Sequence, residues 1–117
     1  MRAAAPALAL TLLLAALPAA AETRCGWIDN PTPGNWWLTD AAGEWTLAEQ
    51  GGYQAGGMDR IPDLSTGEWV ATNGPHGYGC ACMDAETDGA DRIVAIFAVR
   101  QLKLADCAAD PALPSRP

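Results

Sequence analysis

The residues with the clearest chemical potential lie in the segment 76–82, which reads His-Gly-Tyr-Gly-Cys-Ala-Cys. One imidazole and two thiolates this close together could bind zinc or copper, or the two thiols could take part in redox exchange. Both functions require free thiols. The chain has 4 cysteines, and an even number indicates two disulfides if the protein is exported. The sequence therefore favours structural cysteines. The alternative is a thiol redox or metal-binding protein that uses Cys80 and Cys82.

The four cysteines, Cys25, Cys80, Cys82 and Cys107, leave two pairings open. In a strand, residues 80 and 82 point to the same face with about 7 Å between their Cα atoms. That separation exceeds the usual span of a disulfide. The pairs are then either 25–80 with 82–107, or 25–82 with 80–107. Either pairing would tie both ends of the domain to one central segment, so we expect loss of both bonds to unfold it.

Tryptophan is the second notable residue type, with 5 in the chain, at positions 27, 36, 37, 45 and 69. Large aromatic side chains let a small β domain bury area efficiently. Trp36 and Trp37 are adjacent, so on a strand they point to opposite faces, and one is exposed unless both faces are covered. An exposed Trp beside a Pro/Gly-rich loop is a stacking surface for a sugar or a partner side chain. We take Trp36, Trp37 and Tyr53 as candidate ligand contacts.

No catalytic set stands out from the sequence. Ser65 and His76 are present, but nothing marks Ser65 as an activated nucleophile. Asp59 and Asp63 lie in a long Gly-rich stretch and could serve a hydrolase as paired carboxylates. We assign no catalytic residues, no cofactor and no metal, and we favour a non-enzymatic protein over an enzyme.

The N-terminus has the three-part pattern of a signal peptide: Arg2, an apolar run over residues 7–17, and Ala19-Ala20-Ala21. The run is too short to span a bilayer as a helix. Residues 1–21 are therefore predicted to be a cleaved signal, which places the mature protein in the periplasm or outside the cell. The net charge of −7 makes nucleic acid and anionic membrane surfaces poor partners. We expect a monomer with no membrane association after cleavage.

Period-two alternation with aromatic residues favours strands, separated here by Gly/Pro turns. The prediction is an all-β fold, a small disulfide-stabilised barrel or twisted antiparallel meander of about five to seven short strands. Residues 22–107 form one domain, and residues 108–117, which carry three prolines, form a flexible tail. One helical turn is expected within 58–64. The apolar segment 92–99 is expected to be buried on both faces. The other predicted strands are 25–29, 36–40, 44–49, 68–72 and 78–86.

Four strings can be quoted together: Arg-Cys-Gly-Trp at 24–27, Asn-Pro-Thr-Pro-Gly-Asn-Trp-Trp-Leu at 30–38, Gly-Gly-Tyr-Gln at 51–54 and Gly-Tyr-Gly-Cys-Ala-Cys at 77–82. With these strings the chain resembles a family of small exported bacterial proteins catalogued only as a domain of unknown function. The resemblance implies an envelope or secreted location and brings no activity or site residues. We therefore expect a binding or interaction module, such as an inhibitor or an envelope-associated factor, whose partner is an unknown protein or glycan of the cell envelope.

Overall fold

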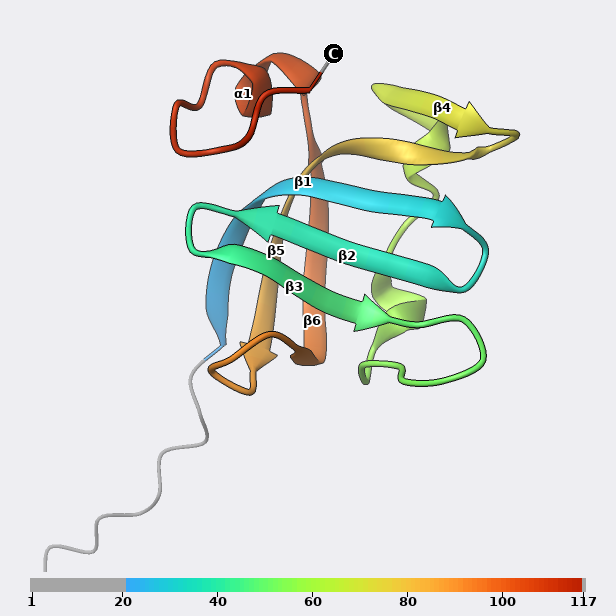
Figure 1. Ribbon diagram of the computed structural model, residues 1–117, viewed down its shortest axis with the longest axis vertical. Coiled ribbons are helices and arrows are strands. Elements are labelled where there is room, and N and C mark those ends of the chain that lie inside the picture. Colours follow the sequence, from blue (N-terminus) through green and yellow to red (C-terminus); the bar gives the residue numbers. More distant parts are fainter. Residues whose placement is uncertain (1–20, 117) are drawn as a thin grey trace, which may run out of the picture.

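The computed structural model describes residues 21–116, which form an antiparallel sheet (Figure 1). The order along the sheet is β3-β2-β1-β5-β4, and β6 pairs with β5 beside β4. The predicted all-β class is confirmed, as an open twisted sheet and not a closed barrel. The strands are β1 (Glu22–Thr32), β2 (Asn35–Asp40), β3 (Gly43–Ala48), β4 (Trp69–Asn73), β5 (His76–Thr87) and β6 (Ile93–Leu102).

The long strand β5 organises the sheet. It pairs with β1 from Glu22↔Ala85 to Asn30↔Gly77. Along its other side it pairs first with β4 and then, from Cys80 onward, with β6. Both β1 and β5 curve strongly through the molecule, as Figure 1 shows. A side chain at Gly26 or Gly77 would collide with a backbone carbonyl of the neighbouring strand, so the close approach of strands at these two points requires glycine.

The two faces of the sheet carry separate cores because side chains alternate along each strand. The larger core covers one face and gathers apolar side chains from five strands and the 51–67 stretch: Ile28, Leu38, Trp45, Leu47, Ala55, Leu64, Ala81, Met83, Ala85, Ile93 and Ile96. On the other face a smaller core joins Trp27 and Cys80 to Cys107 and Leu113. The short helix α1 (Leu104–Ala108) and the segment after it cover this second face.

The disulfides join Cys25 to Cys82 and Cys80 to Cys107, which decides between the two pairings left open by the sequence. Cys25 and Cys82 lie directly opposite each other on β1 and β5. Cys80, on the same face of β5, is then free to hold α1 against the second core. Two disulfides indicate a non-cytoplasmic, oxidising environment. In the described part of the chain, no helix has the length and apolar character needed to cross a membrane.

The segment after α1 differs from the flexible tail expected from its prolines. Leu113 is buried, and the indole N–H of Trp27 donates to the carbonyl of Pro114 at 2.9 Å. Arg116 makes two hydrogen bonds of 2.7 Å to the carboxylate of Asp29. Prolines prevent regular secondary structure, but they do not prevent this segment from packing against β1, which lies far away in the sequence.

Strand β6 also differs from its prediction. Ile93 and Ile96 are buried in the larger core, whereas Val94 and Phe97 are 41% and 44% exposed. Burial on both faces was therefore the wrong interpretation of an apolar run. The second core reaches β6 only at its last residue, Leu102, so Val94 and Phe97 lie outside the area that α1 and the C-terminal segment cover. The expected helical turn within 58–64 is present as the 3₁₀ turn η1 (Met58–Arg60), and a second one, η2 (Leu64–Thr66), follows it.

The predicted signal peptide, residues 1–21, lies outside the described residues except for Ala21.

Candidate functional site

The structure separates the three candidate ligand contacts. Trp36 and Trp37 point to opposite faces of β2, as expected for neighbours on a strand, and Trp36 packs against the larger core. Tyr53 lies in the loop after β3, where its hydroxyl donates to the carbonyl of Ile93 at 2.5 Å. The guanidinium of Arg92 stacks on the Tyr53 ring, 4.5 Å from its centroid. Tyr53 therefore holds a loop to β6 and does not share a site with Trp36.

Trp36 instead forms the wall between two clefts. The first cleft, of about 330 Å³, lies between the ends of β1 and β2, the η2 turn and the β4–β5 hairpin, and Trp69 forms its second aromatic wall. The second cleft, of about 340 Å³, lies toward η1 and includes Asp59 and Gln54. Trp36 and Pro62 line both clefts, so they form a ridge that the two clefts share. We call the two clefts together the groove.

The aromatic walls are held in position by their surroundings. The Trp69 indole N–H donates to the carbonyl of Pro75 at 3.1 Å, which ties the ring to the turn that begins β5. The side chain of Trp69 also packs closely over Gly79, where a Cβ would meet the ring. The cleft is therefore bounded by strands of the sheet, and such rigid positioning favours a preorganised ligand site.

His76, the single histidine of the chain, lines the first cleft and is oriented by Asn30. The Nδ1 atom of His76 lies 2.9 Å from Oδ1 of Asn30. Both amide hydrogens of Asn30 are used, on the carbonyls of Thr32 and Asn35. The oxygen of Asn30 must then accept, so Nδ1 of His76 carries a hydrogen. In the neutral imidazole, Nε2 is therefore the unprotonated nitrogen with a lone pair.

Ser65 and Asp63 also line the first cleft, but they are bonded to each other. Asp63 precedes η2, and its Oδ1 accepts from the Ser65 backbone N–H at 3.1 Å and from the Ser65 hydroxyl at 2.6 Å. A hydroxyl has one hydrogen, so Ser65 donates to Asp63 and not to His76. This is the geometry of a cap on a short helical turn and not of an activated nucleophile.

The carboxylates proposed for a hydrolase are not paired. Asp63 lines the first cleft and Asp59 lines the second, with Trp36 and Pro62 between them. They therefore do not flank one point in space, as the two carboxylates of a glycosidase must. Neither cleft is lined by a lysine or an arginine in the part of the chain that the structure describes.

The Cys-Ala-Cys segment carries no free thiol in this structure. Cys80 and Cys82 belong to different disulfides, so neither supplies the thiolate that the alternative function requires. Among residues 21–116, no group of three or more His, Cys, Asp or Glu side chains could hold a metal ion.

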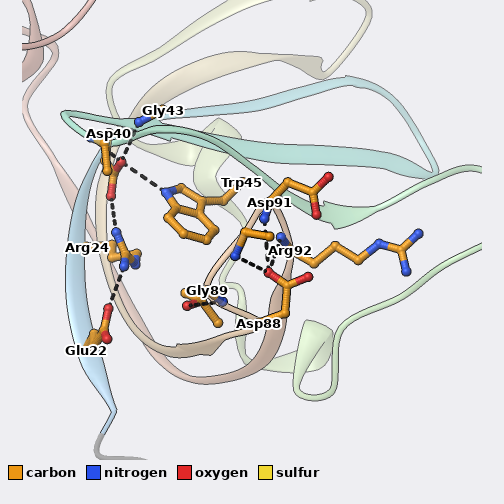
Figure 2. A network of polar contacts seen from close by, with 12 residues as sticks. Glu22, Arg24, Asp40, Gly43, Trp45, Asp88, Gly89, Asp91 and Arg92 are labelled. Carbon is orange, nitrogen blue, oxygen red and sulfur yellow. Dashed lines mark hydrogen bonds and ion pairs between the residues drawn. The ribbon is translucent and has the colours of Figure 1, made fainter.

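A second polar cluster lies at the other end of the larger core, where Arg24 joins β1 to the β2–β3 hairpin (Figure 2). Its guanidinium contacts the carboxylates of Asp40 at 2.8 Å and Glu22 at 2.5 Å. It also stacks on Trp45, 4.1 Å from the ring centroid. Asp40 further accepts from the Trp45 indole at 3.0 Å and from two amides of the hairpin turn. These contacts fix the hairpin.

The charges of this cluster are stabilised mutually. Burial raises the pKa of Asp40, but hydrogen bonds from Arg24, Trp45 and the Ala42 amide outweigh it and lower the pKa below its usual value. Desolvation lowers the pKa of Arg24, yet the hydrogen bonds and charges of Asp40 and Glu22 raise it overall. The beginning of β6 is held in a similar way, since Asp88 accepts three backbone N–H groups in the β5–β6 turn (Figure 2). The buried Nε of Arg24 has no hydrogen-bond partner within the described residues, but the other polar groups satisfy one another, so we regard the cluster as structural.

The sequence did not single out Asn30 or Trp69 for the site. Asn30 stands in a dense turn signal, yet it continues β1 and is buried. Nothing in the sequence distinguished Trp69 from the tryptophans that pack in the core. The sequence did place both residues near Pro/Gly turns. Such turns mark strand ends, and strand ends can meet at one edge of a sheet.

No curated protein and no solved structure matches the chain. A family model described as a protein of unknown function, DUF4087, matches residues 19–114. This match covers nearly all of the chain that the structure describes. The chain therefore belongs to the DUF4087 family of proteins of unknown function.

Proposed function

We propose that this chain is a non-enzymatic binding module that acts outside the cytoplasm, in the periplasm or secreted, and that its ligand occupies the groove around Trp36. The observation that carries this proposal is the position of Trp36 as the shared wall of two clefts. An indole with clefts on both sides offers a large, rigid contact area at low entropic cost. The neighbouring His76 Nε2 adds a directional polar group.

The scaffold supports the same function. Two disulfides hold β1, β5 and α1 together. Because β1 contributes Asn30 and β5 contributes His76 to the first cleft, this part of the groove is built on elements that change little on binding. The side chains that could have served catalysis are not arranged for it. The Ser65 hydroxyl donates to Asp63, and Asp59 and Asp63 line separate clefts. The net charge of −7 argues against nucleic acid as the ligand, so a protein or a glycan of the cell envelope is the proposed partner, bound by a monomer.

The experiment is chemical-shift mapping on the isotope-labelled mature protein. The probes are a neutral N-acetylglucosamine trisaccharide, short peptides of different charge and a small organic cation. We expect at least one probe to shift the indole signal of Trp36 together with the signals of Trp69 and His76. Absence of a concentration-dependent shift in the groove for every probe would overturn the proposal.

The matched control is supplied by the adjacent tryptophan. Trp36→Leu removes the aromatic wall and should abolish binding, whereas Trp37→Leu changes the same residue type on the opposite face and should leave binding intact. Urea unfolding of both variants checks that they fold. Loss of binding in both variants to the same extent would contradict a site at Trp36.

A further inference from the structure

The polar side chains of the first cleft present hydrogen-bond acceptors. His76 offers the lone pair of Nε2, because Asn30 fixes the hydrogen on Nδ1. Ser65 offers only oxygen lone pairs, because its hydrogen is donated to Asp63. The carboxylate of Asp63 uses Oδ1 for these local bonds, and within residues 21–116 its Oδ2 receives no hydrogen bond. A ligand that satisfies this lining must therefore supply donors.

The donors of the lining are largely consumed by the fold. The Trp69 N–H bonds to Pro75, and both amide hydrogens of Asn30 bond to backbone carbonyls. This leaves the Trp36 indole N–H as the side-chain donor without a partner among the described lining residues. With Asp63 in the first cleft, Asp59 in the second and no lysine or arginine lining either one, the charge of the groove is negative and uncompensated.

We propose that the first cleft binds the arginine side chain of a basic peptide segment of a partner protein. The inference rests on the function proposed above and names its ligand class. A guanidinium is planar, so it stacks on an indole such as Trp36 or Trp69. It also carries five N–H donors in one plane, which suit acceptors that lie on different elements, here η2 and the start of β5. A lysine ammonium matches the charge but not the planar stacking.

The second cleft supports a peptide over an isolated cation. It lies on the other side of Trp36 and Pro62 from the first cleft and brings a second carboxylate, Asp59. Each cleft, at about 330–340 Å³, lies at the lower end of ligand-pocket volumes, which suits one side chain each. An extended chain could therefore place neighbouring side chains on either side of the Trp36 ridge. The net charge of −7 would attract a basic partner from a distance.

The test measures the affinity of capped tri-arginine peptide for the mature protein by calorimetry. The comparison probes are the capped tri-citrulline peptide, which has the same shape without the charge, the capped tri-lysine peptide, spermidine and the neutral trisaccharide. We expect tri-arginine to bind at the groove and tri-citrulline to bind at least about tenfold more weakly. Tri-lysine should fall between them.

The variant Asp63→Asn tests the carboxylate directly. Asparagine also caps helical turns, so the variant keeps η2 while losing the charge, and we expect about a tenfold loss of tri-arginine affinity. Asp91→Asn is the charge-matched control. It removes the same charge from the exposed β5–β6 turn, and its effect should stay below about twofold at physiological salt, because exposed distant charges are screened.

Several results would overturn the inference. These are equal affinity for tri-citrulline and tri-arginine, equal losses in Asp63→Asn and Asp91→Asn, or spermidine binding as tightly as the peptide. Binding of the trisaccharide at Trp36 without binding of tri-arginine would overturn the arginine ligand but leave the proposed function intact. Failure of every probe to bind in the groove would overturn both.

Discussion

The two disulfides should differ in what their removal does to the protein. The bonds close segments of very different length, with sequence separations of 57 for Cys25–Cys82 and 27 for Cys80–Cys107. Loop entropy alone assigns about 4.2 kcal/mol to the first and about 3.6 kcal/mol to the second. Chain length therefore predicts that the first disulfide is the more important for stability.

The packing of the cysteines reverses this order. Cys25 is exposed and faces its partner across a strand pair that is also held by the backbone. Cys80 and Cys107 are 1% and 3% exposed, and their bond holds a helix of only five residues, α1, against the second core. Each buried sulfur removed adds about 1 kcal/mol of lost packing. Release of α1 would also loosen Leu113 and the contact between Arg116 and Asp29.

Cys82 is buried as well, at 4% exposed, so this pair loses one buried sulfur where the other loses two. We therefore expect the double variant C25A/C82A to lose about 5 kcal/mol of unfolding free energy and to keep its native contacts. The double variant C80A/C107A should lose about 5–7 kcal/mol. Alanine is preferred to serine because a buried hydroxyl without a partner would add its own cost. Urea unfolding followed by tryptophan fluorescence measures the two values.

Hydrogen exchange separates global from local effects. The amides of Ala109, Asp110 and Leu113 are bonded within the C-terminal segment. They should lose protection in C80A/C107A under native conditions while the β1–β5 amides keep theirs. In C25A/C82A they should stay protected up to the global unfolding. The reasoning would be refuted if C25A/C82A proved the less stable variant, or if the C-terminal amides stayed protected without the Cys80–Cys107 bond.

Three further predictions concern single residues. Burial raises the pKa of Asp40, but hydrogen bonds from Arg24 and its neighbours lower it overall. The ionised Asp40 therefore stabilises the folded protein above the unfolded pKa near 4, and this contribution is lost as the pH falls through the folded pKa. Asp40→Asn should cost about 3 kcal/mol at pH 7, and chemical denaturation should show the difference from wild type shrinking below about pH 4. Arg116→Gln breaks the partly exposed bidentate contact with Asp29 and should cost about 1–2 kcal/mol in urea unfolding. The fluorescence of Trp27 should also change, because the guanidinium lies over its ring. Gly57→Ala places a Cβ against a carbonyl of β6 at a φ of 81°, whereas Gly51→Ala, at a φ of 74°, meets open space. Gly57→Ala should lower the thermal midpoint more than Gly51→Ala. Equal shifts would show that the positive φ alone, and not the clash with the carbonyl, sets the loss of stability.

The two disulfides also indicate the redox environment of the protein. Disulfides are stable in oxidising compartments, and wild-type protein recovered from a reducing cytoplasm should lack both bonds. Intact mass with and without thiol alkylation checks the two-disulfide state of protein produced in an oxidising compartment.

The sequence by itself determined the elements of this fold, because the signals for strands and turns are local. Alternation at Trp36 and Leu38, and again at Trp45 and Leu47, marked the two strands of a hairpin. The even cysteine count predicted two disulfides, and the adjacency of Trp36 and Trp37 predicted one ring on each face. Each of these inferences depends on residues only a few positions apart.

Only the tertiary structure decided which of these elements meet. The register of β1 against β5 sets Cys25 opposite Cys82 and leaves Cys80 for Cys107. The same strand pair brings Asn30 to His76, 46 positions away in the sequence. Local sequence patterns do not specify strand register or strand curvature, because both arise from the packing of the whole sheet. The groove at Trp36 exists for that reason: it is made where strand ends that are distant in the sequence converge on one edge of the fold.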